Sequence, residues 1–349
     1  MYRYFALVLA IALIGAPAVA QDRPALTVIA HDSFNYTQSV MDAFTEDTGT
    51  PVETIRLGDT GLLVNQSILN RDNPLGDVIF GVDNTFLGRA LANDLFIPYE
   101  SPALETVDDT FIVDDEHRVT PIDYGDVCLN YAVSYFEDNN LAVPETLEQL
   151  TQPNYRGLLV VQNPATSSPG LAFLLTTIAV FGEDGDYTWV DYWRDLVAND
   201  VLISDDWTDA YYNQFSGSLG SIGTRPLVVS YASSPPAEVF FAEPQPETAP
   251  TAAITAEDTC FRQIEFAGIL RGTEMETEAQ QFIDFLLSRA FQEDMPLNMF
   301  VFPVNSEAEL PEVFVEHAAI PENPIVFPPD AIEDGREEWL RTWTETVLR

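Results

Sequence analysis

The chain has 349 residues, of which 46% are hydrophobic, and its 56 acidic residues far outnumber its 15 basic residues, all of them arginine. The net charge of −41 argues against nucleic acids and anionic membranes as partners, because both require a basic surface. The apolar fraction is that of a globular protein, and the length suits two lobes better than one small core.

The N-terminal segment Met1–Ala20 predicts a cleaved secretory signal peptide. Its apolar run follows Arg3 and ends with the small residues 18–20 before Gln21. A membrane anchor is the alternative, but the run is short for a bilayer span of about 20 residues. No cysteine stands at the expected cleavage point, so a lipid anchor is not expected. The sequence thus predicts a soluble periplasmic or secreted protein without a lipid anchor.

Strand and helix patterns alternate in the first third of the mature chain. Strands are predicted at Leu26–His31, Val52–Leu57 and Asp77–Val82, and each is followed by a helical pattern. Such alternation predicts parallel strands with right-handed crossovers. Ligands gather at the carboxyl ends of such strands. Candidate ligand contacts are therefore the polar residues after these strands, namely His31, Asp32, Ser33, Asp59, Thr60, Asp83 and Asn84.

A second α/β unit is predicted in the middle of the chain. Its strands are expected at Asp123–Tyr131, Leu158–Gln162 and Leu227–Tyr231, and its helices at Pro169–Phe181 and Tyr187–Asn199. The following stretch, Phe240–Asp258, is rich in Pro, Ala, Thr and Glu and has no apolar period. We interpret it as a surface excursion.

The last part of the chain predicts a returning strand at Gln263–Ile269 and helices at Glu276–Ser288 and Pro329–Leu348. Two α/β units with a late return indicate two lobes that are joined by two crossings, with a ligand cleft between them. Lobe 1 is predicted to comprise residues 21–126 and 264–349, including the C-terminal helices. Lobe 2 is predicted to comprise residues 127–263.

The chain has two cysteines, Cys128 and Cys260, and both lie beside the predicted crossings. An exported protein lives in an oxidising compartment, which favours an intramolecular disulfide. This bond requires the two residues to lie on adjacent strands, and two buried free thiols are the alternative. The spacing fits no metal site, and neither a metal nor a cofactor is predicted.

The sequence contains no nucleophile elbow, P-loop or glycine-rich dinucleotide motif. No catalytic residue is assigned, and the protein is predicted not to be an enzyme. Thr166, Ser167 and Ser168 precede an apolar helix, where they form either a plain N-cap or a site for phosphate or carboxylate. Aromatic residues near strand ends are candidates for packing or for stacking on a flat or cationic ligand: Trp207, Tyr211, Tyr231 and Phe300.

These residues belong to segments that resemble the solute-binding proteins of bacterial ABC importers, and among them the periplasmic thiamine-binding proteins. The resemblance runs from about Leu26 to Arg349, and its specificity comes from the order and spacing of the segments. The main ones are Asp32-Ser33-Phe34, DVIFGVDN at Asp77–Asn84, Asp123-Tyr124-Gly125, QNPATSSPGL at Gln162–Leu171, Trp207 with Tyr211, and Ser230-Tyr231 with Ser234-Pro235.

The resemblance implies a two-lobed type II periplasmic-binding-protein fold. It also implies a monomer that binds thiamine, or thiamine mono- or diphosphate, and docks on an ABC transporter permease. Trp207 and Tyr231 match aromatic residues that contact thiamine, and Asp59 matches a carboxylate that hydrogen-bonds it. The complete expected contact set is His31, Asp32, Ser33, Asp59, Thr60, Asp83, Asn84, Tyr124, Thr166, Ser167, Ser168, Trp207, Tyr211, Tyr231, Ser234 and Phe300.

The chain departs from this family pattern at four places. His31 stands where the family has a Tyr, and Phe300 stands where it has a Trp. Ala165 replaces an Arg beside the Thr-Ser turn, and Pro236-Ala237 replaces another ligand-facing Tyr. These changes leave the phosphorylation state of the ligand open. The alternatives are the same fold with another solute, such as ferric iron or a small organic anion, and a secreted hydrolase.

Overall fold

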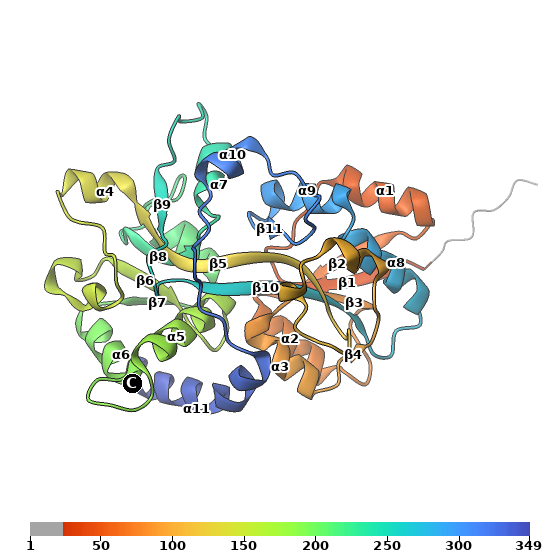
Figure 1. Cartoon of the computed structure of the whole chain (residues 1–349), viewed down its shortest axis with the longest axis horizontal. Coiled ribbons are helices and arrows are strands. Elements are labelled where there is room, and N and C mark those ends of the chain that lie inside the picture. Colours follow the sequence, from red (N-terminus) through yellow and green to blue (C-terminus); the bar gives the residue numbers. More distant parts are fainter. Residues whose placement is uncertain (1–23) are drawn as a thin grey trace, which may run out of the picture.

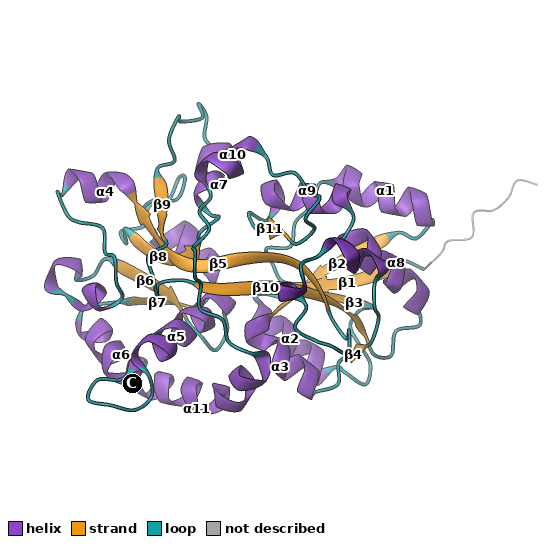
Figure 2. Cartoon of the chain, in the orientation of Figure 1, coloured by secondary structure: helices purple, strands orange, loops and turns teal. Residues whose placement is uncertain are grey.

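The computed structural model describes residues 24–349, and the predicted signal peptide lies outside them. The described residues form an eleven-stranded mixed sheet whose main strand order is β2-β1-β3-β10-β5-β8-β6-β7. Helices cover both faces of this sheet (Figures 1 and 2). Within this part of the chain, we find no helix with the length and apolar character that a bilayer crossing needs.

The first half of the sheet follows the predicted alternation of strands and helices. β1 (Leu26–Ala30) lies between β2 (Val52–Arg56) and β3 (Val78–Asp83) and runs parallel to both. The helices α1 (Gln38–Thr48), α2 (Thr60–Leu69) and α3 (Asn84–Ala92) follow these strands in turn. The carboxyl ends of the three strands therefore meet at one edge of the sheet, as expected for parallel strands.

The second half has parallel pairing as well. β6 (Leu159–Gln162) lies between β7 (Leu202–Ser204) and β8 (Leu227–Tyr231). Its main helices are α5 (Ser168–Phe181) and α6 (Trp189–Ala198), and two short helices are α4 (Val133–Asp138) and α7 (Pro235–Phe240). The first eleven residues of α5 are all buried, which explains why its sequence is apolar on every side.

A short strand, β9 (Thr251–Ile254), occupies part of the predicted surface excursion. It pairs antiparallel with the end of β5, with Ile254 opposite Leu129. The prediction of an irregular segment is therefore wrong for these residues. Thr251 and Ile254 are buried, whereas the two residues between them are short alanines, and four such residues give too weak a pattern for a strand to be recognised.

Two long antiparallel strands, β5 (Thr120–Ala132) and β10 (Phe261–Leu270), join the two halves at the centre of the sheet (Figure 1). Because side chains alternate along a strand and paired residues share a face, the register assigns the residues of β5 and β10 to the two faces of the sheet. Asp123, Gly125, Gln263 and Glu265 lie on one face, and Asp126, Cys128, Cys260 and Arg262 lie on the other. The lobe boundaries at residues 126/127 and 263/264 stay a prediction, because these strands run through them without a break.

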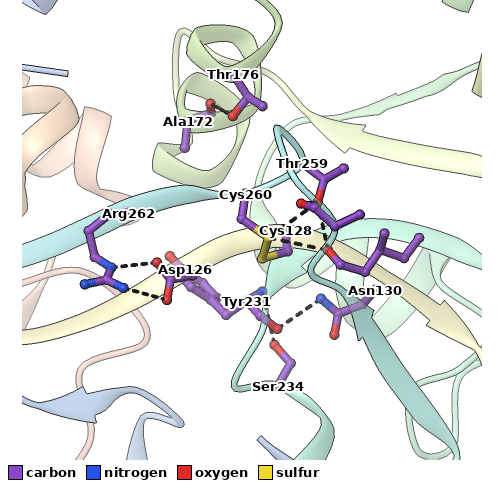
Figure 3. The surroundings of a disulfide bond; sticks show 12 residues. Asp126, Cys128, Asn130, Ala172, Thr176, Tyr231, Ser234, Thr259, Cys260 and Arg262 are labelled. Carbon is purple, nitrogen blue, oxygen red and sulfur yellow. Dashed lines mark hydrogen bonds and ion pairs between the residues drawn. A yellow bond between two sulfur atoms is a disulfide. The ribbon is translucent and has the colours of Figure 1, made fainter. Parts of the chain in front are cut away.

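The predicted disulfide joins Cys128 to Cys260, whose Cα atoms are 4.4 Å apart (Figure 3). Two residues before Cys128 and two residues after Cys260, Arg262 Nε donates to Asp126 Oδ1 at 2.6 Å. Burial raises the pKa of Asp126, and the hydrogen bond and charge of Arg262 offset part of this rise. A covalent bond and an ion pair thus hold the two crossing strands together on the face that does not carry Glu265.

The C-terminal elements connect both lobes. α8 (Glu276–Leu286) and α9 (Arg289–Asn298) pack near α1, while α10 (Glu312–His317) packs against α7. The final helix, α11 (Pro329–Val347), contacts α3 of one half and α6 of the other, and Figure 1 shows it beneath both. Arg336 lies 4.3 Å above the ring of Phe86, and Trp343 packs edge-on against Trp193. Two further short strands are β4 (Phe96–Ile97) and β11 (Phe302–Pro303).

Candidate ligand-binding site

A cavity of about 410 Å³ lies between the two halves of the sheet. One side is formed by the residues after β1 and β2, and the other by β8 and by η5 (Asp209–Gln214), a turn of π-helix. Single π-helical turns are frequent at functional sites. The lining includes most of the predicted contacts, namely His31, Asp32, Ser33, Asp59, Thr60, Ser168, Trp207, Tyr211, Tyr231, Ser234 and Phe300.

Asp83 and Asn84 lie outside the cavity lining. Their side chains form hydrogen bonds that connect the elements around the cavity. The carboxylate of Asp83 is fully buried and accepts hydrogen bonds from the hydroxyls of Ser168 and Thr85. Since Ser168 begins α5, this contact ties the end of β3 to the opposite lobe. The side chain of Asn84 donates to a backbone carbonyl of β10 at 3.0 Å and accepts from a backbone N–H of the same strand at 3.1 Å.

The other predicted residues outside the lining have different positions. Tyr124 stacks between the rings of Phe111 and Phe302, at centroid distances of 4.8 and 5.3 Å. The hydroxyl of Thr166 donates to a backbone carbonyl of lobe 2 at 2.7 Å. Ser167 precedes α5 at the N-cap position and is fully buried. Their roles as ligand contacts stay a prediction.

The most ordered part of the lining is an aromatic stack held by hydrogen bonds. The rings of Trp207 and Tyr211 lie 4.9 Å apart and only 16° from parallel. Trp207 Nε1 donates to Ser230 Oγ at 3.0 Å, and the hydroxyl of Tyr211 donates to Glu238 at 2.9 Å. Both rings are therefore fixed at their polar ends. Since Tyr211 is only 1% exposed, the ring face that remains for a flat ligand is that of Trp207.

Tyr231 completes this surface at the end of β8. Its hydroxyl accepts from the side-chain amide of Gln263 at 3.0 Å. A Cβ atom on Gly125 would come within 2.9 Å of the Tyr231 ring, so the ring needs a glycine at this position of β5. We call Trp207, Tyr211 and Tyr231 the aromatic wall.

A second group of residues lies side by side on neighbouring strands or directly after one of them. We call this group, which comprises His31, Asp83, Asp123 and Glu265, the floor cluster. The register pairs Glu265 with Asp83 on one side and with Asp123 on the other. His31 follows β1, and its Nε2 atom lies 3.3 Å from Glu265. Gly81, with a φ of +90°, leaves room for this ring, since a Cβ atom there would lie 2.0 Å from it.

The sequence did not point to Glu265 or Gln263 as site residues, although both line the cavity. They lie on the returning strand β10 and not after a strand end, where polar residues were sought. The available signal was their spacing, because Gln263 and Glu265 stand at alternate positions and therefore on one face of the strand.

Three carboxyl groups of the site, those of Asp83, Asp123 and Asp59, have pKa values above the ordinary range. Burial raises the pKa of Asp83 to about 6, against the opposing effect of its hydrogen bonds with Ser168 and Thr85. Burial, and then the charges of Glu265 and Asp83, raise the pKa of Asp123 well above its ordinary value. Burial also raises the pKa of Asp59, and nearby donors offset only part of the rise.

We expect Asp123→Asn to raise the free energy of unfolding at pH 7 by about 1–3 kcal/mol. Asp123 is fully buried, and neither of its carboxyl oxygens has a hydrogen-bond partner within residues 24–349. A carboxyl whose pKa is raised by folding contributes stability that is complete below its unfolded pKa and is lost as the pH rises through the folded pKa. The gain should therefore shrink toward pH 4, as measured by urea unfolding at several pH values.

The control for this measurement is Asp126→Asn on the same strand. It should lower stability, because it removes the carboxylate that pairs with Arg262. A loss of stability at pH 7 in Asp123→Asn as well would contradict the interpretation of Asp123 as an unfavourable buried charge.

Phe300 lies in a backbone conformation that bulky residues seldom adopt, with a φ of 57°. Its carbonyl accepts from the hydroxyl of Ser233 at 2.7 Å, and its ring packs against Phe241 at 5.6 Å and Phe314 at 6.1 Å. This loop therefore closes one side of the cavity by contacts with the turn after β8.

Known proteins show a consistent similarity to this chain. The model of the family described as bacterial extracellular solute-binding protein matches residues 73–321. The thiamine-binding periplasmic protein of Salmonella typhimurium is 28% identical over 348 residues, with 97% of each chain covered. A solved periplasmic thiamin binding protein superposes with a TM-score of 0.80 at 26% identity, covering 94% of this chain and 97% of the other.

More distant structures share the fold. A ferric binding protein from Campylobacter jejuni has a TM-score of 0.70 at 16% identity, covering 92% of this chain and 99% of the other. Together, these similarities confirm the predicted fold class, a two-lobed type II periplasmic binding protein.

Proposed function

The chain belongs to the family of bacterial extracellular solute-binding proteins, and on that premise we propose that it captures thiamine outside the cytoplasm for an ABC importer. The curated relatives that match nearly its whole length are thiamine-binding periplasmic proteins. In this proposal, residues 1–20 direct export and are removed. The protein then binds thiamine as a monomer, without catalysis, and delivers it to a membrane permease.

The observation that supports thiamine most directly is the pairing of an aromatic wall with carboxylates in one cavity. Trp207 and Tyr231 provide ring faces, while Asp59 and Glu265 line the same space. Thiamine combines a flat aminopyrimidine with a permanently cationic thiazolium. Ring faces suit both parts, and carboxylates suit the positive charge, so the lining matches the two chemical halves of this ligand.

Thiamine phosphates remain candidates for the same site. Ser168 lines the cavity at the start of α5, and the N-terminus of a helix attracts anions. Ala165 stands where related proteins have an arginine, and the guanidinium of Arg56, which lines the cavity, donates to the backbone carbonyl of Phe34. We therefore propose that the unphosphorylated form binds at least as well as the phosphates.

We expect saturating thiamine to raise the melting temperature of the purified protein by about 5 °C. A ligand that binds only the folded state stabilises it by mass action. Thermal shift and calorimetry with thiamine, its mono- and diphosphate and simple quaternary ammonium ions would measure the preference. No response to any thiamine species would contradict the proposed ligand and leave the fold assignment unchanged.

Ferric iron is the alternative ligand to include in the same experiment, because iron-binding proteins share the fold. The tyrosine pair that suggests it, Tyr211 and Tyr212, is arranged with the rings 83° apart. The hydroxyl of Tyr211 already donates to Glu238. A coloured complex on addition of ferric citrate would favour iron over thiamine.

A further inference from the structure

Glu265 occupies an irregular point of the central strand β10. The register of β10 shifts between Glu265 and Phe266 against β5, and between Phe266 and Ala267 against β3. Bulges of this kind redirect side chains and are frequent beside functional sites. The result is a carboxylate that lines the ligand cavity from the middle of the sheet.

The imidazole of His31 is the group that faces this carboxylate. Its Nε2 atom lies 3.3 Å from both carboxylate oxygens, and the two residues are only 6% and 7% exposed. Burial lowers the pKa of His31, but the charge and hydrogen bond of Glu265, followed by the charges of Asp59 and Asp83, raise it overall. In the protein without ligand, the group placed to neutralise Glu265 is therefore the imidazole of His31.

We propose that the His31–Glu265 pair exchanges a proton for the positive charge of the ligand. This inference rests on the proposed function, since the thiazolium of thiamine supplies the incoming charge. When that charge enters the cavity beside Glu265, it repels the imidazolium. The N–H bond of His31 then breaks, the proton passes to the solvent, and the neutral imidazole remains next to the bound cation.

The other charged and titratable groups around the pair come from several elements. The carboxyl groups of Asp83 and Asp123 flank Glu265 in the sheet, and Asp59 approaches from the start of α2. The cavity lining also contains Asp32, Arg56 and Tyr231. Arg56 donates to the backbone carbonyl of Phe34 at 2.7 Å. The nearest cationic group to Glu265 that gains or loses a proton near neutral pH is thus His31.

The exchange makes the affinity for thiamine depend on pH. A proton that is present before binding and absent afterwards weakens binding at low pH. Affinity should rise by up to about tenfold per pH unit until the pH exceeds the raised pKa of His31, and then level off. A Tyr at position 31, as in related proteins, would not carry this proton, so the dependence belongs to this chain.

Calorimetry of thiamine binding from pH 5.5 to 8.5, in buffers of different ionisation enthalpy, measures both affinity and proton release. For the wild type we expect release of up to one proton and an affinity that increases with pH. His31→Gln should release fewer protons than the wild type and show a weaker increase, because only carboxyl groups such as Asp83, whose pKa is about 6, still titrate in this range. His317→Gln, a control variant at a histidine that lies outside the cavity lining, should behave as the wild type. Wild-type binding of thiamine that does not vary with pH, or a pH dependence in His31→Gln equal to that of the wild type, overturns the exchange.

Glu265→Gln tests the other half of the pair while preserving the shape of the side chain. We expect it to weaken thiamine binding about 30-fold and to leave binding of thiochrome, an uncharged oxidation product of thiamine, within about threefold of the wild type. The matched control is Glu100→Gln, because Glu100 lies 3.8 Å from His117 outside the cavity lining. Equal thiamine affinity in Glu265→Gln and the wild type overturns the role of Glu265.

A measurement without ligand separates this inference from the proposed function. NMR titration of the His31 ring should show a pKa above the ordinary histidine value in the wild type and a lower one in Glu265→Gln. An unchanged value in the variant overturns the pairing. If the wild type binds no thiamine at any pH, the proposed function fails, while the titration still decides whether Glu265 holds the His31 proton.

Discussion

Replacement of Trp207 by alanine is expected to weaken thiamine binding by about 30- to 100-fold. The indole ring forms the largest flat surface of the aromatic wall, and its partner Tyr211 holds it in place by stacking at 4.9 Å. The substitution removes the ring face from the ligand and also leaves Ser230 without the indole N–H that donates to it. The loss of the ring face acts on the bound state, so calorimetry should show a larger dissociation constant.

Two further variants test whether the ring face is responsible. Trp207→Phe retains an aromatic face without the indole N–H and should recover most of the affinity. Tyr187→Phe alters an aromatic residue on the exposed side of lobe 2, where its hydroxyl donates to Asp195, and should have no effect. If Trp207→Ala binds thiamine as tightly as the wild type, the ligand does not stack on this wall.

Removal of the disulfide should have the largest effect on stability. We expect the double variant Cys128→Ala/Cys260→Ala to lose about 4 kcal/mol in its free energy of unfolding. The bond closes a loop of 132 residues, and without it the unfolded chain gains conformational freedom. Urea unfolding of the oxidised wild type and the variant gives the difference, and a reductant added to the wild type should reproduce it.

Binding should respond much less than stability to this change. The disulfide lies on the face of β5 and β10 that also carries the Asp126–Arg262 pair, away from Gln263 and Glu265. Thiamine affinity of the folded variant should therefore stay within about threefold of the wild type. A reductant that has no effect on the unfolding of the wild type would contradict the stabilising role of the bond.

The sequence predicted those parts of the fold in which local pattern and burial agree. The strands β1 and β3 have short apolar runs that end in polar residues, and β2 has an alternating pattern. The helix α5 is apolar on every side because it is buried on every side. β9 was missed because its pairing with β5 depends on residues more than a hundred positions away. The contact of α11 with both lobes is equally non-local. An apolar stripe predicts that a helix packs on one face, but it does not identify the element that this face contacts.

The same distinction holds for the candidate site. Polar residues after strands and aromatic residues near predicted loops and strand ends led to His31, Asp59, Trp207 and Tyr231, all of which line one cavity. Glu265 escaped notice because its position depends on the register of β10 between two strands and on a bulge. Neither the register nor the bulge can be recognised in the sequence, which shows only that Glu265 is a charged residue between apolar neighbours.

The placement of β10 also determines the order in which the molecule can be assembled. β3 has β1 on one side and β10 on the other, but the chain between β3 and β10 includes the whole of β5 to β9. While the chain is synthesised from its N-terminus, one edge of β3 therefore stays unpaired until residue 270 has been added. By then the pairings among β5, β6, β7, β8 and β9 are available. The lobe that begins the sequence is thus the last to be completed, and Cys260 arrives next to Cys128 just as that completion becomes possible.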